Sequence, residues 1–196
     1  MKSDRSILLR RSQPPPRWRG EIEFVLIPAG RLRRRVAELA GEIESDYAGR
    51  ELVIVSLLTG TVLFLADLIR NISLPLRLDF IGVSSYGAGT VSRDLVFTKE
   101  LRLDVKGRDV LLVDDILDTG RTMEAVLARL GKLRPASVKT CVLLEKAARR
   151  AVDIDGDYVG FSIPDLFVVG YGLDFAERYR NLPFVGALHP KLYREA

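Results

Sequence analysis

The stretch Val110-Leu-Leu-Val-Asp-Asp-Ile-Leu-Asp-Thr-Gly-Arg-Thr122 decides the fold of this 196-residue chain. Its four leading apolar residues predict a strand that is buried on both faces, as in a parallel sheet. The carboxylates of Asp114 and Asp115 are expected where this strand leaves the sheet, and a short turn then leads into a helix over 122–132. Ligands of open α/β sheets bind beyond the carboxyl ends of the strands, so this turn is the first candidate site.

The residues of this turn have the chemistry of a phosphate site. A helix N-terminus offers unpaired N–H groups and the positive end of its dipole. Gly120 allows close approach of the backbone, and Thr119 and Thr122 add hydroxyl donors. Asp114 and Asp115 would accept hydrogen bonds from sugar hydroxyls or help to hold Mg²⁺. Taken singly, each residue also fits a solvated turn or a helix cap, and the segment lacks the Walker A pattern.

Strands and helices alternate on both sides of this segment. Apolar spacing predicts helices over 31–47 and 61–71. Short apolar runs predict strands at 51–57, 76–84, 137–144, 158–162 and 166–170, with a hairpin-like return through 95–103. This alternation predicts an α/β fold with a mainly parallel sheet.

Positive charge is concentrated at the start of the chain. Residues 1–35 hold ten Lys and Arg against three Asp and Glu, whereas 36–196 hold twenty against twenty-three. We therefore expect a flexible basic arm over 1–20 and a single folded domain over 21–196. A solvated leader is the simplest interpretation of the arm, and binding of nucleic acid or another acidic partner is the alternative.

Composition excludes several classes of protein. Hydrophobic residues make up 47% of the chain and charged residues 29%, which is typical of a globular protein. One cysteine and one histidine leave no internal disulfide and no Cys/His zinc cluster, and a Ser-His-Asp hydrolase is a poor fit. The apolar runs are far shorter than the roughly 18 residues of a membrane span. The arm lacks the apolar core of a secretory signal, so a cytoplasmic location is the default expectation.

The segment 110–122 resembles the phosphoribosyl-pyrophosphate (PRPP) signature of the type I phosphoribosyltransferases. Within them, the chain resembles the hypoxanthine-guanine phosphoribosyltransferases from about residue 22 to 189. The further motifs that carry the resemblance are Leu58-Thr59-Gly60, Ser85-Tyr86, Lys146 and 165–182. The resemblance implies the type I phosphoribosyltransferase fold, a mainly parallel sheet flanked by helices with a small hood from the two ends of the chain.

The resemblance also implies a role for each motif. Asp118 would be the catalytic acid or base facing N7 of the purine, and Lys146 would donate to O6. Phe167 would stack on the base, and the backbone of Val168 would contact its other edge. Ser85 and Tyr86 would open a lid loop over the site.

The remaining implied roles concern PRPP and the metal. PRPP and its phosphate would be bound by Asp114, Asp115, Asp118, Thr119, Gly120, Arg121 and Thr122. Pyrophosphate would be bound by Leu58, Thr59, Gly60 and Arg180. Mg²⁺ would be held by Asp174 together with Asp114 and Asp115.

The implied function is purine salvage. PRPP and hypoxanthine or guanine would give IMP or GMP and pyrophosphate, and the enzyme would be a dimer or tetramer of identical chains. A different class of protein is an RNA-binding regulator, similar to the pyrimidine-operon attenuation proteins. Asp118 and the hood motif disfavour it, since those proteins have tyrosine at the position of Asp118. Transfer to adenine is disfavoured by Lys146, and the ranking of hypoxanthine, guanine and xanthine stays open.

Each implied role has a plainer alternative. Lys146 also fits a solvated strand end, Phe167 a core position, Arg180 an exposed surface and Asp174 a turn cap. Two positions depart from the family pattern. Thr59 stands where these enzymes usually have lysine, which removes one positive charge from the pyrophosphate loop, and Asp114 stands where many have glutamate.

Overall fold

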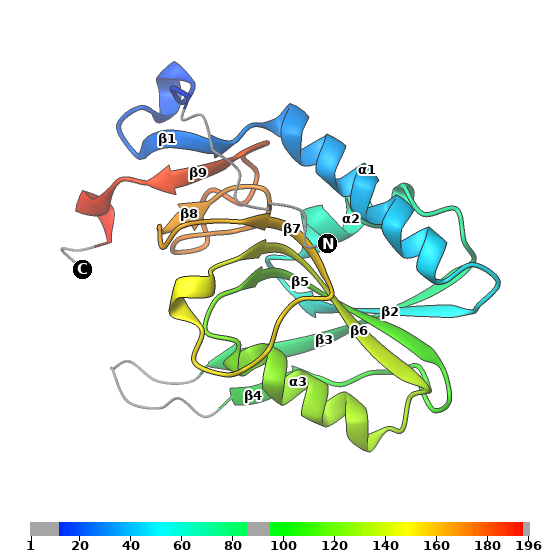
Figure 1. The fold of residues 1–196 in the computed structure, drawn as a ribbon. Helices are drawn as coiled ribbons and strands as arrows, with labels where there is room; N and C mark the ends of the chain where they lie inside the picture. The colour runs from blue at the N-terminus through cyan, green and yellow to red at the C-terminus, as the bar shows by residue number, and fades with distance from the viewer. Residues whose placement is uncertain (1–11, 86–94, 194–196) are drawn as a thin grey trace.

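The computed structural model describes residues 12–85 and 95–193 (Figure 1). Within these residues, a six-stranded sheet has the order β4-β3-β2-β5-β6-β7. Its strands are β2 (Leu52–Leu58), β3 (Leu76–Ser85), β4 (Leu95–Lys99), β5 (Asp109–Leu117), β6 (Ser137–Glu145) and β7 (Tyr158–Ser162). Only the edge strand β4 pairs antiparallel; the neighbours from β3 to β7 are parallel. The predicted α/β fold is therefore confirmed.

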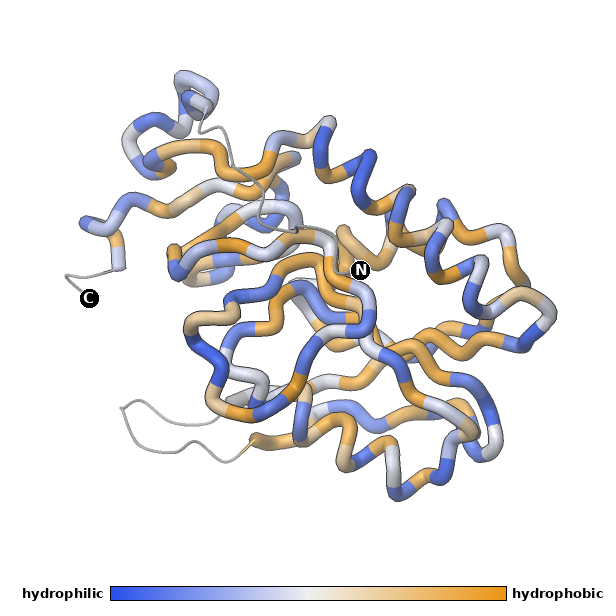
Figure 2. Tube along the Cα trace, viewed as in Figure 1, coloured by the Kyte–Doolittle hydropathy of each residue, from blue (hydrophilic) through white to orange (hydrophobic). Residues whose placement is uncertain are grey.

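Helices cover both faces of this sheet (Figure 1). α1 (Ala29–Asp46) and α2 (Val62–Arg70) pack on one face, and α3 (Arg121–Lys132) packs on the other. α1 buries Leu32, Val36, Leu39, Ala40 and Ile43, which recur at the helical spacing seen in the sequence. The central strands are buried on both faces, and Figure 2 shows their continuous hydrophobic colouring beside the alternating colours of α1.

A smaller antiparallel sheet lies beyond one end of the central sheet, and we call it the hood (Figure 1). Its order is β1-β9-β8, from β1 (Ile22–Ile27), β9 (Val185–Leu188) and β8 (Val168–Val169). The strands β1 and β9 were not predicted from the sequence, and β8 is shorter than the strand predicted at 166–170. Short 3₁₀ helices span Pro16–Trp18, Ala147–Arg149 and Pro190–Leu192.

The N-terminal arm is described from residue 12 onward, and this part contacts the hood. Ser12 and Val25 exchange backbone hydrogen bonds, and the ring of Trp18 meets that of Tyr179 edge-on, with 5.8 Å between centroids. Residues 12–20 thus differ from the poorly ordered leader that the sequence suggested; residues 1–11 lie outside the described part, and the domain boundary at 20 stays a prediction. In the described ranges, no helix is both long and apolar enough to cross a membrane.

Candidate active site

The paired carboxylates lie inside β5, not beyond its end. The sequence analysis placed the end of this strand at Asp114, but β5 pairs with β6 as far as Leu117 and Glu145. The reason is that β6 is equally long and supplies backbone partners beside the carboxylates. Asp114 is only 8% exposed, and its Oδ1 accepts from the Asp115 backbone N–H at 2.9 Å.

Burial dominates the electrostatics of this pair. Loss of hydration raises the pKa of Asp114 well above its usual value, and the neighbouring charge of Asp115 raises it further. Burial also raises the pKa of Asp115, while hydrogen bonds and the positive charge of Arg180 act in the opposite direction. These two adjacent carboxylates within β5, of which Asp114 is buried and Asp115 is partly exposed, are thus poised for hydroxyl groups or cations, which would relieve the unfavourable burial of their charge.

The turn after β5 leads directly into the N-terminus of α3. Gly120 has φ +86°, and an added Cβ would lie 2.5 Å from a methyl group of Val152, so this position requires glycine. The Thr119 carbonyl accepts from the Ala151 N–H at 2.9 Å, which fixes the turn against a neighbouring loop. Within the described part of the chain, the N-cap Gly120 supplies no side-chain hydrogen bond to the first turn of α3. Its first amides are thus available to an anion, and the phosphate site predicted here stays a prediction.

The loop after β2 touches Asp115. Leu58 and Thr59 are joined by a cis peptide bond. An added Cβ on Gly60 would lie 1.8 Å from Asp115 Oδ2, and one on Gly172 would lie 1.9 Å from the Gly60 carbonyl oxygen. Three chain segments that are far apart in sequence therefore meet at Gly60. Their contacts leave no room for a side chain at Gly60 or at Gly172.

A cavity of about 290 Å³ opens between the loop after β2 and the C-terminal part of β5 with the turn that follows it. Most predicted PRPP and pyrophosphate residues line it: Leu58, Gly60, Asp114, Asp115, Asp118, Thr119, Gly120 and Thr122. The wall also includes Val83 of β3, Met123 of α3, and Leu57, Thr61, Ile116 and Leu117. Arg121 and Thr59 belong to the same loops but are not part of the lining, and neither are Lys146, Phe167 and Val168.

Asp118 belongs to a cluster of four charged side chains. Lys146, 5% exposed, has its Nζ 3.8 Å from Asp118 Oδ2 and 3.8 Å from Asp165 Oδ1. Arg149 lies 3.4 Å from Asp118 Oδ1 and 3.7 Å from Asp165 Oδ1. Asp118 Oδ1 is buried and accepts no hydrogen bond from the described residues. The sequence analysis gave Arg149 and Asp165 no role, because nothing in their spacing marks the contact.

The hood places Phe167 at the surface and Val168 in β8. The Phe167 side chain is 38% exposed, an unusual position for a large apolar group. Tyr193 stacks on it with 4.9 Å between centroids, and Phe175 meets it edge-on at 5.5 Å. Val168 is buried and pairs with Ala187 of β9. An exposed aromatic ring held by two others suits the predicted stacking on a base.

Asp174 and Arg180 form an ion pair with each other, and the Arg180 charge also acts on Asp115. Arg180 Nη1 lies 2.9 Å from Asp174 Oδ1 and donates to the Gly172 carbonyl at 3.0 Å. Asp174 Oδ2 accepts from the Glu177 N–H at 3.0 Å. Across residues 12–85 and 95–193, no group of three or more His, Cys, Asp or Glu is arranged to hold a metal. The predicted set of Asp114, Asp115 and Asp174 is therefore not a preformed three-carboxylate site.

The predicted lid lies at the limit of the described structure. Ser85 is the last residue of β3, and Tyr86 lies outside the described residues. The lid assignment stays a prediction.

Comparisons with known proteins agree with this geometry. The family called Phosphoribosyl transferase domain matches residues 28–176. The chain is 48% identical to the hypoxanthine phosphoribosyltransferase of Salmonella typhimurium, over 83% of this chain and 93% of the relative. It is 42% identical to the hypoxanthine-guanine phosphoribosyltransferase of Mycobacterium avium, over 94% of each chain.

Longer relatives and solved structures are also similar. The chain is 46% identical to the bifunctional protein TilS/HprT of Listeria monocytogenes, but it spans only 27% of that protein's length. The crystal structure of a hypoxanthine phosphoribosyltransferase from Staphylococcus aureus superposes with a TM-score of 0.87 at 39% identity, over 92% of this chain and 99% of that one. The chain belongs to the phosphoribosyltransferase family, and within it to the hypoxanthine and hypoxanthine-guanine phosphoribosyltransferases.

Proposed function

We propose that this chain transfers the 5-phosphoribosyl group of PRPP to N9 of hypoxanthine or guanine, giving IMP or GMP and pyrophosphate. The observation that carries the proposal is the cavity at the C-terminal part of β5, where Asp114, Asp115, the first turn of α3 and Asp118 meet. The amides of residues 119–122 would bind the 5′-phosphate, and Asp114 and Asp115 would accept from the ribose hydroxyls.

In the proposed reaction, Asp118 handles the proton of the base. The N9 lone pair forms a bond to C1′ of ribose as the bond from C1′ to pyrophosphate breaks, and the electron pair leaves with pyrophosphate. The purine then loses its N7 proton to Asp118, whose Oδ1 has no donor among the described residues. Substrate would have to displace the contact of Arg149 with this oxygen.

Lys146 and Phe167 would recognise the base. The Lys146 ammonium would donate to O6 of a 6-oxopurine, whereas the 6-amino group of adenine would leave two donors opposed. The exposed face of Phe167 would stack on the ring, and the backbone of Val168 would contact its far edge. The structure keeps Lys146 between Asp118 and Asp165, one residue before the 3₁₀ helix at Ala147–Arg149.

Pyrophosphate would lie against the loop of Leu58, Thr59 and Gly60, with Arg180 adding positive charge. Members of the family generally use Mg²⁺, and the residues here fit it, because Mg²⁺ is usually held by one or two carboxylates together with substrate phosphates. Asp174 would be one ligand, and Asp115 and the buried Asp114 offer further oxygens. When bound, Mg²⁺ would neutralise charge on the leaving group. We also propose that the chain forms a dimer or tetramer of identical subunits.

A panel of bases incubated with PRPP and Mg²⁺ tests the proposal. Nucleotide should form with hypoxanthine and guanine and not with adenine. Asp118→Asn should fold, bind PRPP and lose about 10²–10⁴-fold in kcat, the usual contribution of a general acid or base. A loss of less than about threefold would show that Asp118 does not handle the proton.

A further inference from the structure

The loop that carries Asp174 and Arg180 has an unusual backbone. Tyr171, Ala176, Glu177 and Tyr179 have φ of +52°, +51°, +60° and +76°. Among the described residues, the other non-glycine residue with positive φ is Arg134. Left-handed conformations are unfavourable for residues with a Cβ, and they persist only where surrounding contacts impose them. Contacts from outside the loop must therefore hold residues 170–182 in this shape.

One such contact comes from α2, the helix that follows the loop of Leu58, Thr59 and Gly60. The Tyr171 hydroxyl donates to Asp67 Oδ2 at 2.6 Å, and Arg70 holds the other oxygen at 2.7 Å. Tyr171 is 7% exposed, so its hydroxyl has little access to water as an alternative partner. Its hydrogen bond therefore connects the loop of residues 170–182, which we call the hood loop, to α2, the helix that follows the proposed pyrophosphate loop.

The residue after Tyr171 makes the connection to the site. An added Cβ on Gly172 would lie 1.9 Å from the Gly60 carbonyl oxygen, so the two loops are already in contact there. The Gly172 N–H donates to the Arg180 carbonyl at 2.9 Å, and the Gly172 carbonyl accepts from the Arg180 guanidinium at 3.0 Å. That guanidinium also pairs with Asp174. A shift of Tyr171 would therefore move Gly172, Arg180 and Asp174 together.

We propose that Tyr171, held by Asp67, is a positioning residue that fixes the loop of Asp174 and Arg180 against Gly60 for pyrophosphate and PRPP binding. This inference rests on the proposed function. It assigns Tyr171 no contact with substrate. Its effect runs through the backbone of Gly172 and the side chain of Arg180.

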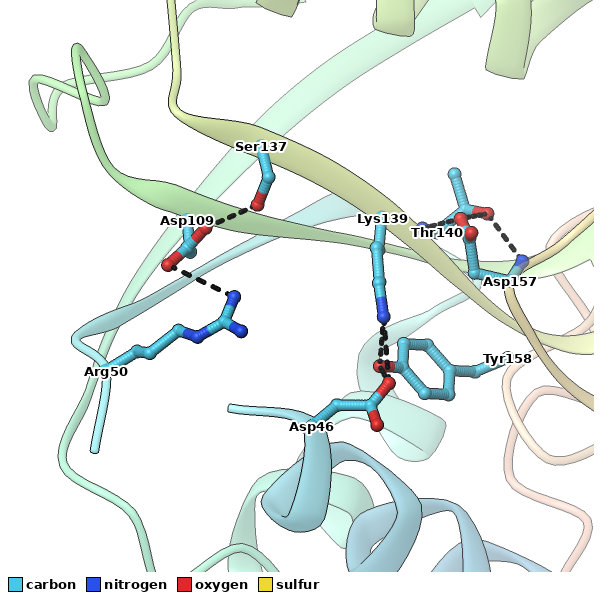
Figure 3. Close-up of polar contacts among 8 residues, drawn as sticks. All are labelled: Asp46, Arg50, Asp109, Ser137, Lys139, Thr140, Asp157 and Tyr158. Atoms are coloured by element: carbon cyan, nitrogen blue, oxygen red, sulfur yellow. Dashed lines mark hydrogen bonds and ion pairs between the residues drawn. The ribbon is translucent and has the colours of Figure 1, made fainter. Parts of the chain in front are cut away.

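A second tyrosine provides the matched control. The Tyr158 hydroxyl donates to Asp46 Oδ2 at 2.5 Å, and Tyr158 is 5% exposed (Figure 3). Lys139 pairs with the same carboxylate at 2.8 Å, as Arg70 does with Asp67. Figure 3 shows this cluster at the start of β6 and β7, the opposite strand ends from the carboxylates of β5. Tyr158→Phe thus removes the same kind of hydrogen bond far from the site.

The test compares Tyr171→Phe, Tyr158→Phe and the unmodified chain. The melting temperature, KM for PRPP, KM for hypoxanthine and calorimetric binding of pyrophosphate with Mg²⁺ are measured for each. Both variants should show similar losses of melting temperature. Tyr171→Phe should raise KM for PRPP about tenfold and weaken pyrophosphate binding about tenfold, with KM for hypoxanthine within about twofold. Tyr158→Phe should leave both KM values and pyrophosphate binding unchanged.

Variants at Asp67 separate positioning from general stability. Asp67→Asn keeps an oxygen that accepts from Tyr171 and should retain pyrophosphate binding, whereas Asp67→Ala should weaken it as Tyr171→Phe does. If Tyr171→Phe matches Tyr158→Phe in every readout while the unmodified chain is active, the inference is wrong and the proposed function stands. If the unmodified chain forms no nucleotide from PRPP and 6-oxopurines, the proposed function itself fails.

Discussion

Gly60→Ala tests the contact at the centre of the proposed site. The new Cβ would lie 1.8 Å from Asp115 Oδ2, whereas ordinary contacts begin near 3.4 Å, so the carboxylate must move by about 1.6 Å. Gly60 does not have a positive φ, so the substitution adds no left-handed strain. Misplacing a positioned group by 1 Å costs roughly 100-fold. We therefore expect kcat/KM for PRPP to fall about 100-fold, which corresponds to about 2.7 kcal/mol of transition-state stabilisation.

The assay is steady-state nucleotide formation with varied PRPP, together with thermal denaturation. Gly41→Ala is the control, because Gly41 is an exposed position in α1 where an added Cβ meets nothing within 4 Å. It should leave kinetics unchanged and raise stability by up to about 1 kcal/mol through helix propensity. A folded Gly60→Ala protein whose kcat/KM for PRPP stays within about threefold of the unmodified chain would refute the role given to Asp115.

The remaining predictions concern base recognition and pH. Lys146→Gln should raise KM for hypoxanthine about 10–100-fold, because the loss of a charge-assisted hydrogen bond weakens binding by about that factor, and KM for PRPP should stay nearly unchanged. A raised KM for PRPP with an unchanged KM for hypoxanthine would instead show that Lys146 contacts the phosphate part of the site. Asp79 accepts from the N–H groups of Leu103, Phe80 and Arg102 and from Lys99, and these bonds outweigh burial and lower its pKa to about 2. Because the lowered pKa favours folding above about pH 4 and loses this effect toward pH 2, Asp79→Ala should cost about 2 kcal/mol at pH 7. Denaturant titrations should show that the difference in unfolding free energy between the unmodified chain and Asp79→Ala becomes smaller as pH falls from about 4 toward 2. A difference that is independent of pH would contradict the lowered pKa of Asp79.

The central sheet was predictable because its signals are local. Leu52–Leu58 is a short apolar run, and α1 repeats its buried residues with helical spacing, so each element is defined by its own sequence. The turn at Gly120 was predictable for the same reason. The end of β5 was misplaced because the strand continues through two aspartates, and only the equal length of β6 explains why. The length of β5 is therefore determined by its pairing with β6.

The hood was less predictable because its signals are not local. β1 and β9 come from opposite ends of the chain, so their pairing leaves no local signal in the sequence. β8 has only two residues, which is too short to show the alternating pattern of a strand. The contact of Arg149 with Asp118 and the bond of Tyr171 to Asp67 join segments that are 31 and 104 residues apart. Resemblance to a family identified the hood motif, but it did not identify these contacts.

The charges of Asp114 and Asp115 in β5 give a reason why the hood loop, which carries Arg180, is held against Gly60. A carboxyl whose pKa is raised by folding favours the folded state at low pH, and it loses that effect as pH rises through the raised pKa. Burial therefore makes the ionised form of either carboxyl unfavourable in the folded chain, and the Arg180 charge is among the groups that lower the pKa of Asp115. Arg180 can do so only while its loop stays against Gly60, in a backbone conformation that is unfavourable by itself. The hydrogen bond of Tyr171 to Asp67 thus helps to hold the loop in the position from which the Arg180 charge acts on Asp115.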